Sequence, residues 1–66
     1  MNFRKALTMR IGDRVIHKQT KEILVIEELE RVELSDYCGV YFHCSDGETY
    51  YHTTVMPADR EEGKSV

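Results

Sequence analysis

The sequence predicts an all-β fold, a small antiparallel barrel or roll of about five strands. Two local patterns indicate it: the Ile-Leu-Val-Ile run at 23–26, which is rich in β-branched residues, and the Asp46-Gly47 pair between two aromatic-rich runs. The third observation is the length, because a chain of 66 residues forms one small domain and buries only about 60% of its unfolded surface. Such a chain has too little core to surround an apolar helix.

The two ends of the chain differ from the part between them. Residues 1–8 show no clear pattern and are expected to form a loose N-terminal arm or a short first strand. Residues 59–66 are charged or small and are expected to form a disordered tail. The barrel is therefore predicted to span residues 9–58.

The first two strands are predicted at 12–18 and within 22–34. Gly12-Asp13 provides a turn that opens the first of them. The apolar run 23–26 predicts a buried strand, and the pattern continues after a bend or bulge. A helix over 22–34 is the alternative, since its glutamates are good helix formers. Residues 35–39 are expected to be a loop.

The Asp46-Gly47 pair predicts a tight hairpin with a two-residue type I′ loop, whose positive φ angles suit Asp-Gly. That loop would set Phe42 opposite Tyr51. Because alternate side chains point to opposite faces, the core face is predicted to carry Val40, Phe42, Cys44, Thr49 and Tyr51. The outer face is predicted to carry Tyr41, His43, Ser45, Glu48, Tyr50 and His52.

The outer face of this hairpin is the candidate binding site. Clustered aromatic rings hold cations and recognise proline-rich or arginine-bearing peptides. The acidic residues of 27–36 favour a cationic partner. A competing interpretation is that cross-strand aromatic pairs only stabilise the sheet, by about 0.2–1 kcal/mol each. The candidate binding residues are Tyr41, His43, Tyr50 and His52, together with Tyr37 from the loop.

Cysteine and histidine side chains raise the alternative of a structural zinc site. Cys38, His43, Cys44 and His52 have suitable ligand types, but no C-x-x-C motif is present. The predicted pleat sends His43 and Cys44 to opposite faces, which also separates a Cys–His nucleophilic pair. A site of His43 and His52 needs a third ligand, Glu48 or His17. No catalytic residue and no cofactor are expected, so the sequence favours a binding module over an enzyme.

Charge is distributed unevenly along the chain. Residues 1–21 hold six basic side chains against one acid, whereas the chain as a whole has a net charge of −3. The basic region leaves nucleic-acid binding as an alternative, which the net charge disfavours. Opposite charges in the two halves also allow a homodimer. Without an apolar membrane span or secretory signal in the sequence, a cytoplasmic location is expected.

A further set of short motifs resembles a known group of proteins. Gly12-Asp13-Arg14-Val15, then Gly39-Val40-Tyr41-Phe42-His43-Cys44 before the Asp46-Gly47 turn, and the close Val55-Met56-Pro57-Ala58 occur in this order. The chain resembles the small SH3-like β-barrels of bacteria over residues 11–58 and is similar to the YodC-like family. The resemblance implies five or so bent antiparallel strands and no activity. Between Glu27 and Cys38 this chain departs from the YodC-like family, because its segment is longer and more acidic.

Overall fold

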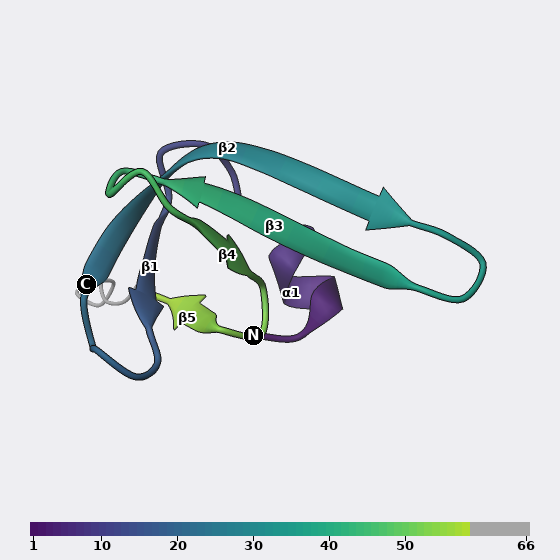
Figure 1. Cartoon of the computed structure of the whole chain (residues 1–66), viewed down its shortest axis with the longest axis horizontal. Helices are drawn as coiled ribbons and strands as arrows, with labels where there is room; N and C mark the ends of the chain where they lie inside the picture. The colour runs from purple at the N-terminus through teal and green to yellow at the C-terminus, as the bar shows by residue number, and fades with distance from the viewer. Residues whose placement is uncertain (59–66) are drawn as a thin grey trace, which may run out of the picture.

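A computed structural model describes residues 1–58, and the predicted disordered tail at 59–66 lies outside the described residues. Five strands form an antiparallel sheet in the order β4-β3-β2-β1-β5 (Figure 1). The five predicted antiparallel strands are confirmed, and the segment 22–34 is a strand rather than a helix. The predicted closed barrel is not formed by the described residues, because β4 and β5 at the two edges do not pair with each other, and one short helix makes the fold mostly β rather than all β. The elements are α1 (Phe3–Ala6), β1 (Arg14–His17), β2 (Ile23–Glu33), β3 (Cys38–Cys44), β4 (Thr49–Tyr51) and β5 (Val55–Pro57).

Strand β2 takes part in both halves of the sheet. Its first residues pair with β1, Leu24 lying opposite Val15, and its residues from Ile26 onward pair with β3. The register shifts between Ile26 and Glu28, which makes Glu27 the extra residue of a β-bulge. A bulge bends a strand and increases its twist, and β2 accordingly curves from the β1–β5 half of the sheet to the β3–β4 half (Figure 1).

The core is formed by alternate residues of the strands and by two residues of the N-terminal segment. Phe42, in β3, is the largest side chain that is fully buried. Burying such a side chain stabilises a fold by about 1.5–3 kcal/mol relative to leaving it exposed. The buried apolar residues are Ala6, Met9, Val15, Leu24, Ile26, Val40, Phe42, Cys44 and Val55.

The apolar run at 23–26 is buried only at every second position, so the prediction of a wholly buried run is wrong. Leu24 and Ile26 point into the core, whereas Ile23 is 61% exposed and Val25 is 38% exposed. The physical reason is the period of two in a strand, which sends neighbouring side chains to opposite faces of a single-layered sheet. Composition alone did not reveal which face is covered.

The N-terminal arm is helical and docked, which corrects the expectation of a loose arm or a short strand. Asn2 caps α1, its side-chain oxygen accepting from the Lys5 backbone N–H at 2.8 Å. Ala6 is buried, and the Phe3 ring lies edge-on to His52 at a centroid distance of 6.0 Å. No helix within residues 1–58 is long and apolar enough to cross a membrane.

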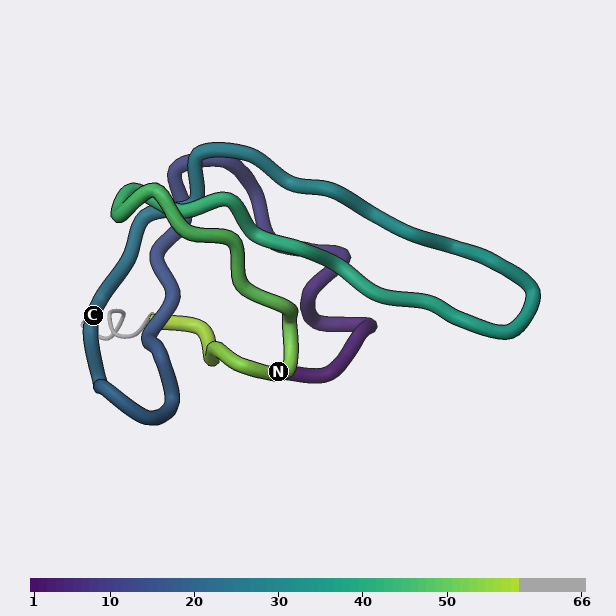
Figure 2. Tube along the Cα trace, in the orientation of Figure 1, coloured from purple at the N-terminus to yellow at the C-terminus, as the bar shows by residue number. Residues whose placement is uncertain are grey.

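The hairpin of β2 and β3 projects beyond the rest of the sheet (Figure 2). The loop predicted at 35–39 is shorter than expected, because β3 begins at Cys38. The long hairpin makes the molecule elongated, with extents of 40 × 25 × 21 Å. Strand β4 accompanies β3 only along residues 41–43, so most of this projection is two strands wide.

Candidate functional site

The turn between β3 and β4 contains three residues rather than the predicted two. The Cys44 N–H donates to the Glu48 carbonyl at 2.9 Å, and the Gly47 N–H donates to the Cys44 carbonyl at 3.0 Å. Gly47 has a φ of 85°, the left-handed conformation that follows a type I turn in a three-residue loop. The type I′ prediction is therefore wrong, although Gly47 has the positive φ that the prediction required.

The longer loop shifts the register of β4 by one residue. A shift of one residue exchanges the two faces of a strand. Thr49 and Tyr51 therefore lie on the outer face, whereas Tyr50 packs against the core. The observed pairs are Tyr41 with Tyr51, Phe42 with Tyr50, and His43 with Thr49.

The structure separates the five predicted binding residues into two groups. Tyr37, Tyr41 and His43 lie together on the outer face. Tyr50 and His52 do not join them. His52 is only 4% exposed, and its Nδ1 accepts a hydrogen bond from the backbone N–H of Val40 at 3.2 Å. Burial lowers the pKa of His52 below its ordinary value, because it disfavours the charged imidazolium.

Three tyrosines from three segments meet on the outer face, and we call Tyr37, Tyr41 and Tyr51 the tyrosine cluster. The hydroxyls of Tyr37 and Tyr41 are 2.8 Å apart and share a hydrogen bond. The Tyr37 and Tyr51 rings are nearly parallel, with centroids 6.3 Å apart, and the Tyr41 and Tyr51 centroids are 5.1 Å apart. Spacings of this kind are favourable for aromatic pairs. Tyr37 is 39% exposed, so the cluster faces solvent.

Gly39 allows the cluster to form. A Cβ atom at this position would lie 2.5 Å from Tyr51 Cε1 and 2.7 Å from the Tyr51 hydroxyl. The Tyr51 ring therefore lies directly over the Gly39 backbone, where any side chain would displace it. The Tyr51 hydroxyl donates to the Cys38 carbonyl at 3.3 Å, which holds the ring in that place.

The Tyr37 hydroxyl is held in its neutral form. Hydrogen bonding with Tyr41, and secondarily with Tyr51, raises the pKa of Tyr37 well above its ordinary value. At neutral pH Tyr37 therefore presents an uncharged ring and an O–H donor. Uncharged, electron-rich rings of this kind attract cations over their faces.

Acidic residues of β2 border the tyrosine cluster. Glu30 is paired with Tyr41, and Glu28 is paired with His43. Directly paired residues in an antiparallel sheet share a face, so both carboxylates lie on the outer face. Both are exposed. The surface therefore combines aromatic rings with negative charge.

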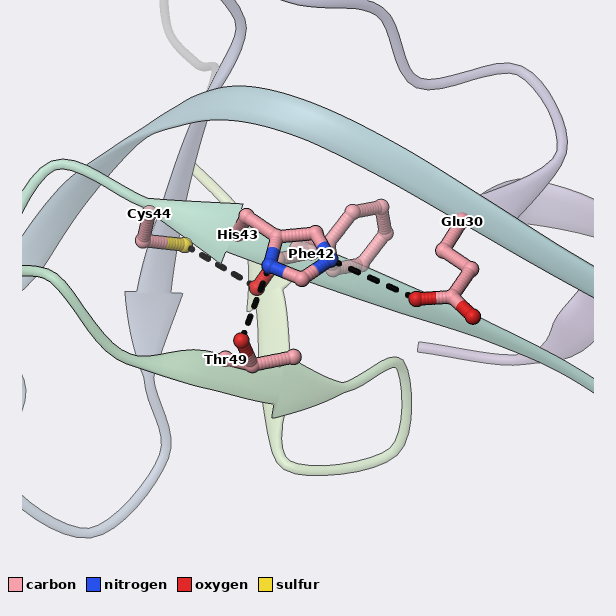
Figure 3. Close-up of polar contacts among 5 residues, drawn as sticks. All are labelled: Glu30, Phe42, His43, Cys44 and Thr49. Atoms are coloured by element: carbon pink, nitrogen blue, oxygen red, sulfur yellow. Dashed lines mark hydrogen bonds and ion pairs between the residues drawn. The ribbon is translucent and has the colours of Figure 1, made fainter.

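His43 links β2 to β4 across the outer face (Figure 3). Its Nε2 lies 3.4 Å from Glu30 Oε1, and its Nδ1 lies 2.9 Å from Thr49 Oγ1. The neighbouring Cys44 points the other way, into the core, where its Sγ lies 3.7 Å from the carbonyl oxygen of Phe42. The predicted divergence of residues 43 and 44 is confirmed.

The structure supports neither the Cys–His nucleophilic pair nor the zinc site that the sequence analysis considered. Burial, followed by the charges of Asp46 and Glu27, raises the pKa of the Cys44 thiol to about 11. Cys38 is exposed, and both cysteines are free. In the described part of the chain no group of three or more histidine, cysteine or acidic side chains could hold a metal ion. The prediction that His43 and His52 share the outer face is wrong, because His52 is buried beside Val40.

A second polar contact lies beside the β3–β4 turn, on the other face of β4. The Tyr50 hydroxyl donates to Asp46 Oδ2, and the Tyr50 ring meets the His17 ring edge-on at 5.2 Å. The hydrogen bond from Tyr50 lowers the pKa of Asp46 and raises the pKa of Tyr50 to about 12. This contact ties the β3–β4 turn to β1 and β4.

Two recesses of about 370 Å³ each lie away from the tyrosine cluster. One is lined by Lys5, Asp13 and Arg14 of the N-terminal region, with Pro57 and Ala58 at the end of β5. The other lies beneath the long hairpin, against α1. Its lining residues are Ala6, Leu7, Met9, Leu29, Arg31 and Val40.

Two members of the outer face, Thr49 and Tyr51, were assigned from the sequence to the core, and Gly39 was assigned to a loop. The signal that identifies all three is the register of the β3–β4 hairpin.

No family model, curated protein or solved structure matches the chain. Its function has to be argued from its own geometry.

Proposed function

We propose that the chain is a small non-enzymatic docking module that binds a cationic segment of a protein or peptide. The binding surface is the outer face of β2, β3 and β4. The observation that carries the proposal is the tyrosine cluster, one exposed and two half-buried rings bordered by Glu28 and Glu30. Aromatic faces and carboxylates both attract arginine and lysine, and each cation–π contact contributes about 0.5–1 kcal/mol at an exposed site.

The arrangement of the strands supports an SH3-like barrel as the scaffold. One long bent strand, β2, is shared between the two halves of the sheet, and the strand order is β4-β3-β2-β1-β5. Strongly bent antiparallel strands around one small core are the architecture that the sequence resemblance implies. Fold alone does not choose a ligand, so the cationic partner is argued from the outer face.

The surroundings of Cys44 and His43 support a binding role over a catalytic one. A nucleophilic cysteine needs a depressed pKa and an adjacent base. The Cys44 thiol instead has a raised pKa and is buried. The imidazole beside it in sequence is on the other face, in contact with Glu30 and Thr49.

The charge of the outer face favours a cationic partner over nucleic acid. Single strands bind where aromatic rings lie in a positively charged groove. The rings of the tyrosine cluster lie instead beside Glu28 and Glu30, which would repel phosphates. Basic Lys5 and Arg14 line a recess with Pro57, away from those rings.

Titration of isotopically labelled protein with a short arginine-rich peptide tests this function. We expect amide shifts centred on Tyr41, His43 and Tyr51, and a Tyr37→Ala variant to bind roughly two- to fivefold more weakly, the value of one exposed cation–π contact. An Ile23→Ala variant alters an exposed residue at the other end of β2, in the part paired with β1, and should bind as the parent does. An acidic peptide of equal length is the ligand control. Shifts elsewhere, or the same shifts with an oligonucleotide and none with the peptide, would overturn the proposal.

A further inference from the structure

We infer that the edge of β2 along residues 28–33 accepts an extended basic peptide as an additional β-strand. The inference rests on the proposed function for the cationic character of the partner, but it assigns a separate site and a separate mode of binding. Strand addition uses main-chain hydrogen bonds for affinity and alternate side chains for specificity. The edge, its side chains and the recess beneath it each carry part of the inference.

Beyond Ile26 the edge of β2 that faces away from β3 has no backbone partner among the described residues. Strand β1 pairs only with Ile23, Leu24 and Val25. The last contacts on this side are at Ile26, whose carbonyl accepts from the Gly12 N–H at 2.8 Å and whose N–H donates to the Asp13 carbonyl at 2.9 Å.

The register of the β2–β3 hairpin shows which backbone N–H and C=O groups of this edge are free. The Leu34 N–H donates to the Tyr37 carbonyl at 2.7 Å, so this pair lies in the hydrogen-bonded position of the ladder. In an antiparallel pair such positions alternate with positions whose N–H and C=O point away from the partner strand. Counting back along β2, the N–H and C=O groups that point away from β3 belong to Leu29, Arg31 and Glu33.

Side chains on the two faces of this edge define the sequence that would fit. The outer face offers Glu28 and Glu30, so lysine or arginine at alternate positions of an added strand would lie beside carboxylates. On the inner face Leu29 and Arg31 line the recess under the hairpin, together with exposed Leu7. An apolar side chain beside Leu29 would enter that recess. The matching peptide therefore alternates basic and apolar residues.

A second copy of this chain is the competing occupant of this edge, and most of its registers are unfavourable. A two-fold axis through an antiparallel pair places a residue opposite its own copy, and like charges directly opposite each other destabilise a sheet. Centring the axis on Glu30 opposes two carboxylates, and centring it on Arg31 opposes two guanidinium groups, whereas centring it on Val32 sets Arg31 opposite Glu33 of the other copy. The same charges protect the edge against aggregation, while they leave it open to a strand of opposite charge.

The test uses a capped hexapeptide that alternates lysine and leucine, with binding to the full chain measured by calorimetry. Two N-methylated versions block one alternate set of peptide N–H groups each. Strand addition predicts that one version binds at least roughly tenfold more weakly, through lost hydrogen bonds and a steric clash, while the other binds as the parent peptide does. Equal effects of both versions, or no binding of the unmethylated peptide, would overturn the inference.

Protein variants provide an independent check. Arg31→Pro removes the central free N–H without removing a bond to β3, and proline is tolerated in a strand at such an edge position. It should lose peptide binding at least roughly tenfold, whereas Arg31→Ala keeps the N–H and should bind at least as well as the parent. Circular dichroism establishes that both variants are folded. If Arg31→Ala and Arg31→Pro bind alike, the edge is not used.

The two proposals can fail separately. If Tyr37→Ala weakens binding of the arginine-rich peptide and the two N-methylated hexapeptides bind alike, the tyrosine cluster binds cations and the edge inference is wrong. If Tyr37→Ala has no effect and one N-methylated peptide fails to bind, the edge is used and the cluster is not. Sedimentation of the protein alone at low salt reports whether the edge pairs with its own copy, a result that would contradict the inference.

Discussion

The two halves of β2 differ in both pairing and composition. Residues 23–26 are aliphatic and pair with β1 or the segment before it on one edge, while on the other edge Val25 is hydrogen-bonded to Ser45 of the turn after β3. Residues 28–33 are mostly charged, and among the described residues they pair only with β3. One bulged residue, Glu27, separates the halves. A single strand therefore supplies core side chains at one end and a mostly exposed, charged arm of the long hairpin at the other.

The largest expected effect is on the free energy of unfolding, measured for one substitution in each half of β2. Ile26→Ala removes a side chain that is 1% exposed and should lower the free energy of unfolding by about 2–5 kcal/mol. Val32→Ala removes a half-buried side chain on the outer face of the projecting hairpin and should cost less than about 1.5 kcal/mol. Urea denaturation measures both variants. Equal losses would mean that the projecting hairpin is as much a part of the core as residues 23–26.

Gly39→Ala tests how the tyrosine cluster is held beside the second half of β2. The added methyl group would lie 2.5 Å from Tyr51 Cε1, so we expect a loss of about 1–3 kcal/mol from overpacking. In a Tyr51→Ala background the same substitution should cost much less, because the obstructing ring is gone. A double-mutant cycle measures this coupling. Additive effects would show that the ring does not lie over Gly39.

The free energy of unfolding should decrease as the pH is lowered, because of His52. Its pKa in the folded protein is below the ordinary value of 6.5, so the unfolded chain binds more protons as the pH falls below that value. The stability contributed by neutral His52 is present above pH 6.5 and is lost as the pH falls towards the folded-state pKa. His52→Asn, which keeps an acceptor for the Val40 N–H, should flatten this dependence. An unchanged slope in the variant would contradict the buried placement of His52.

The smallest effect concerns the contact between Tyr50 and Asp46. An alkaline titration followed by tyrosine absorbance should show Tyr50 ionising at about 12, because its hydroxyl donates to the Asp46 carboxylate. Asp46→Asn should bring this ionisation back towards the ordinary value of 10. A titration with the same high value in the variant would mean that the hydrogen bond is not its cause.

The inward and outward pattern of β3 could be predicted from the sequence, whereas the register of β4 could not. Phe42 and Cys44 point inward and His43 outward, as the alternation of apolar residues indicates. Asp46-Gly47 suits a two-residue loop, but a three-residue loop also uses a glycine with positive φ. The pair alone does not distinguish them, and the choice decides whether Tyr50 or Tyr51 joins the outer face.

The N-terminal helix and the exposed half of the 23–26 run depend on tertiary contacts. A helix as short as α1 is unstable in isolation, and it forms where Ala6 and Met9 meet the core. No periodic pattern at 1–8 reports such docking. Ile23 and Val25 carry the same apolar signal as their buried neighbours, so their exposure follows from the architecture of the sheet.

Amide hydrogen exchange along β2 measures whether this strand changes at Glu27 from pairing on both edges to pairing on one. We expect slow exchange at Ile26 and then an alternation, with Glu30 and Val32 protected by β3 and the amides of Leu29, Arg31 and Glu33 exchanging rapidly. Uniform protection across residues 29–33, or rapid exchange at Ile26, would contradict it.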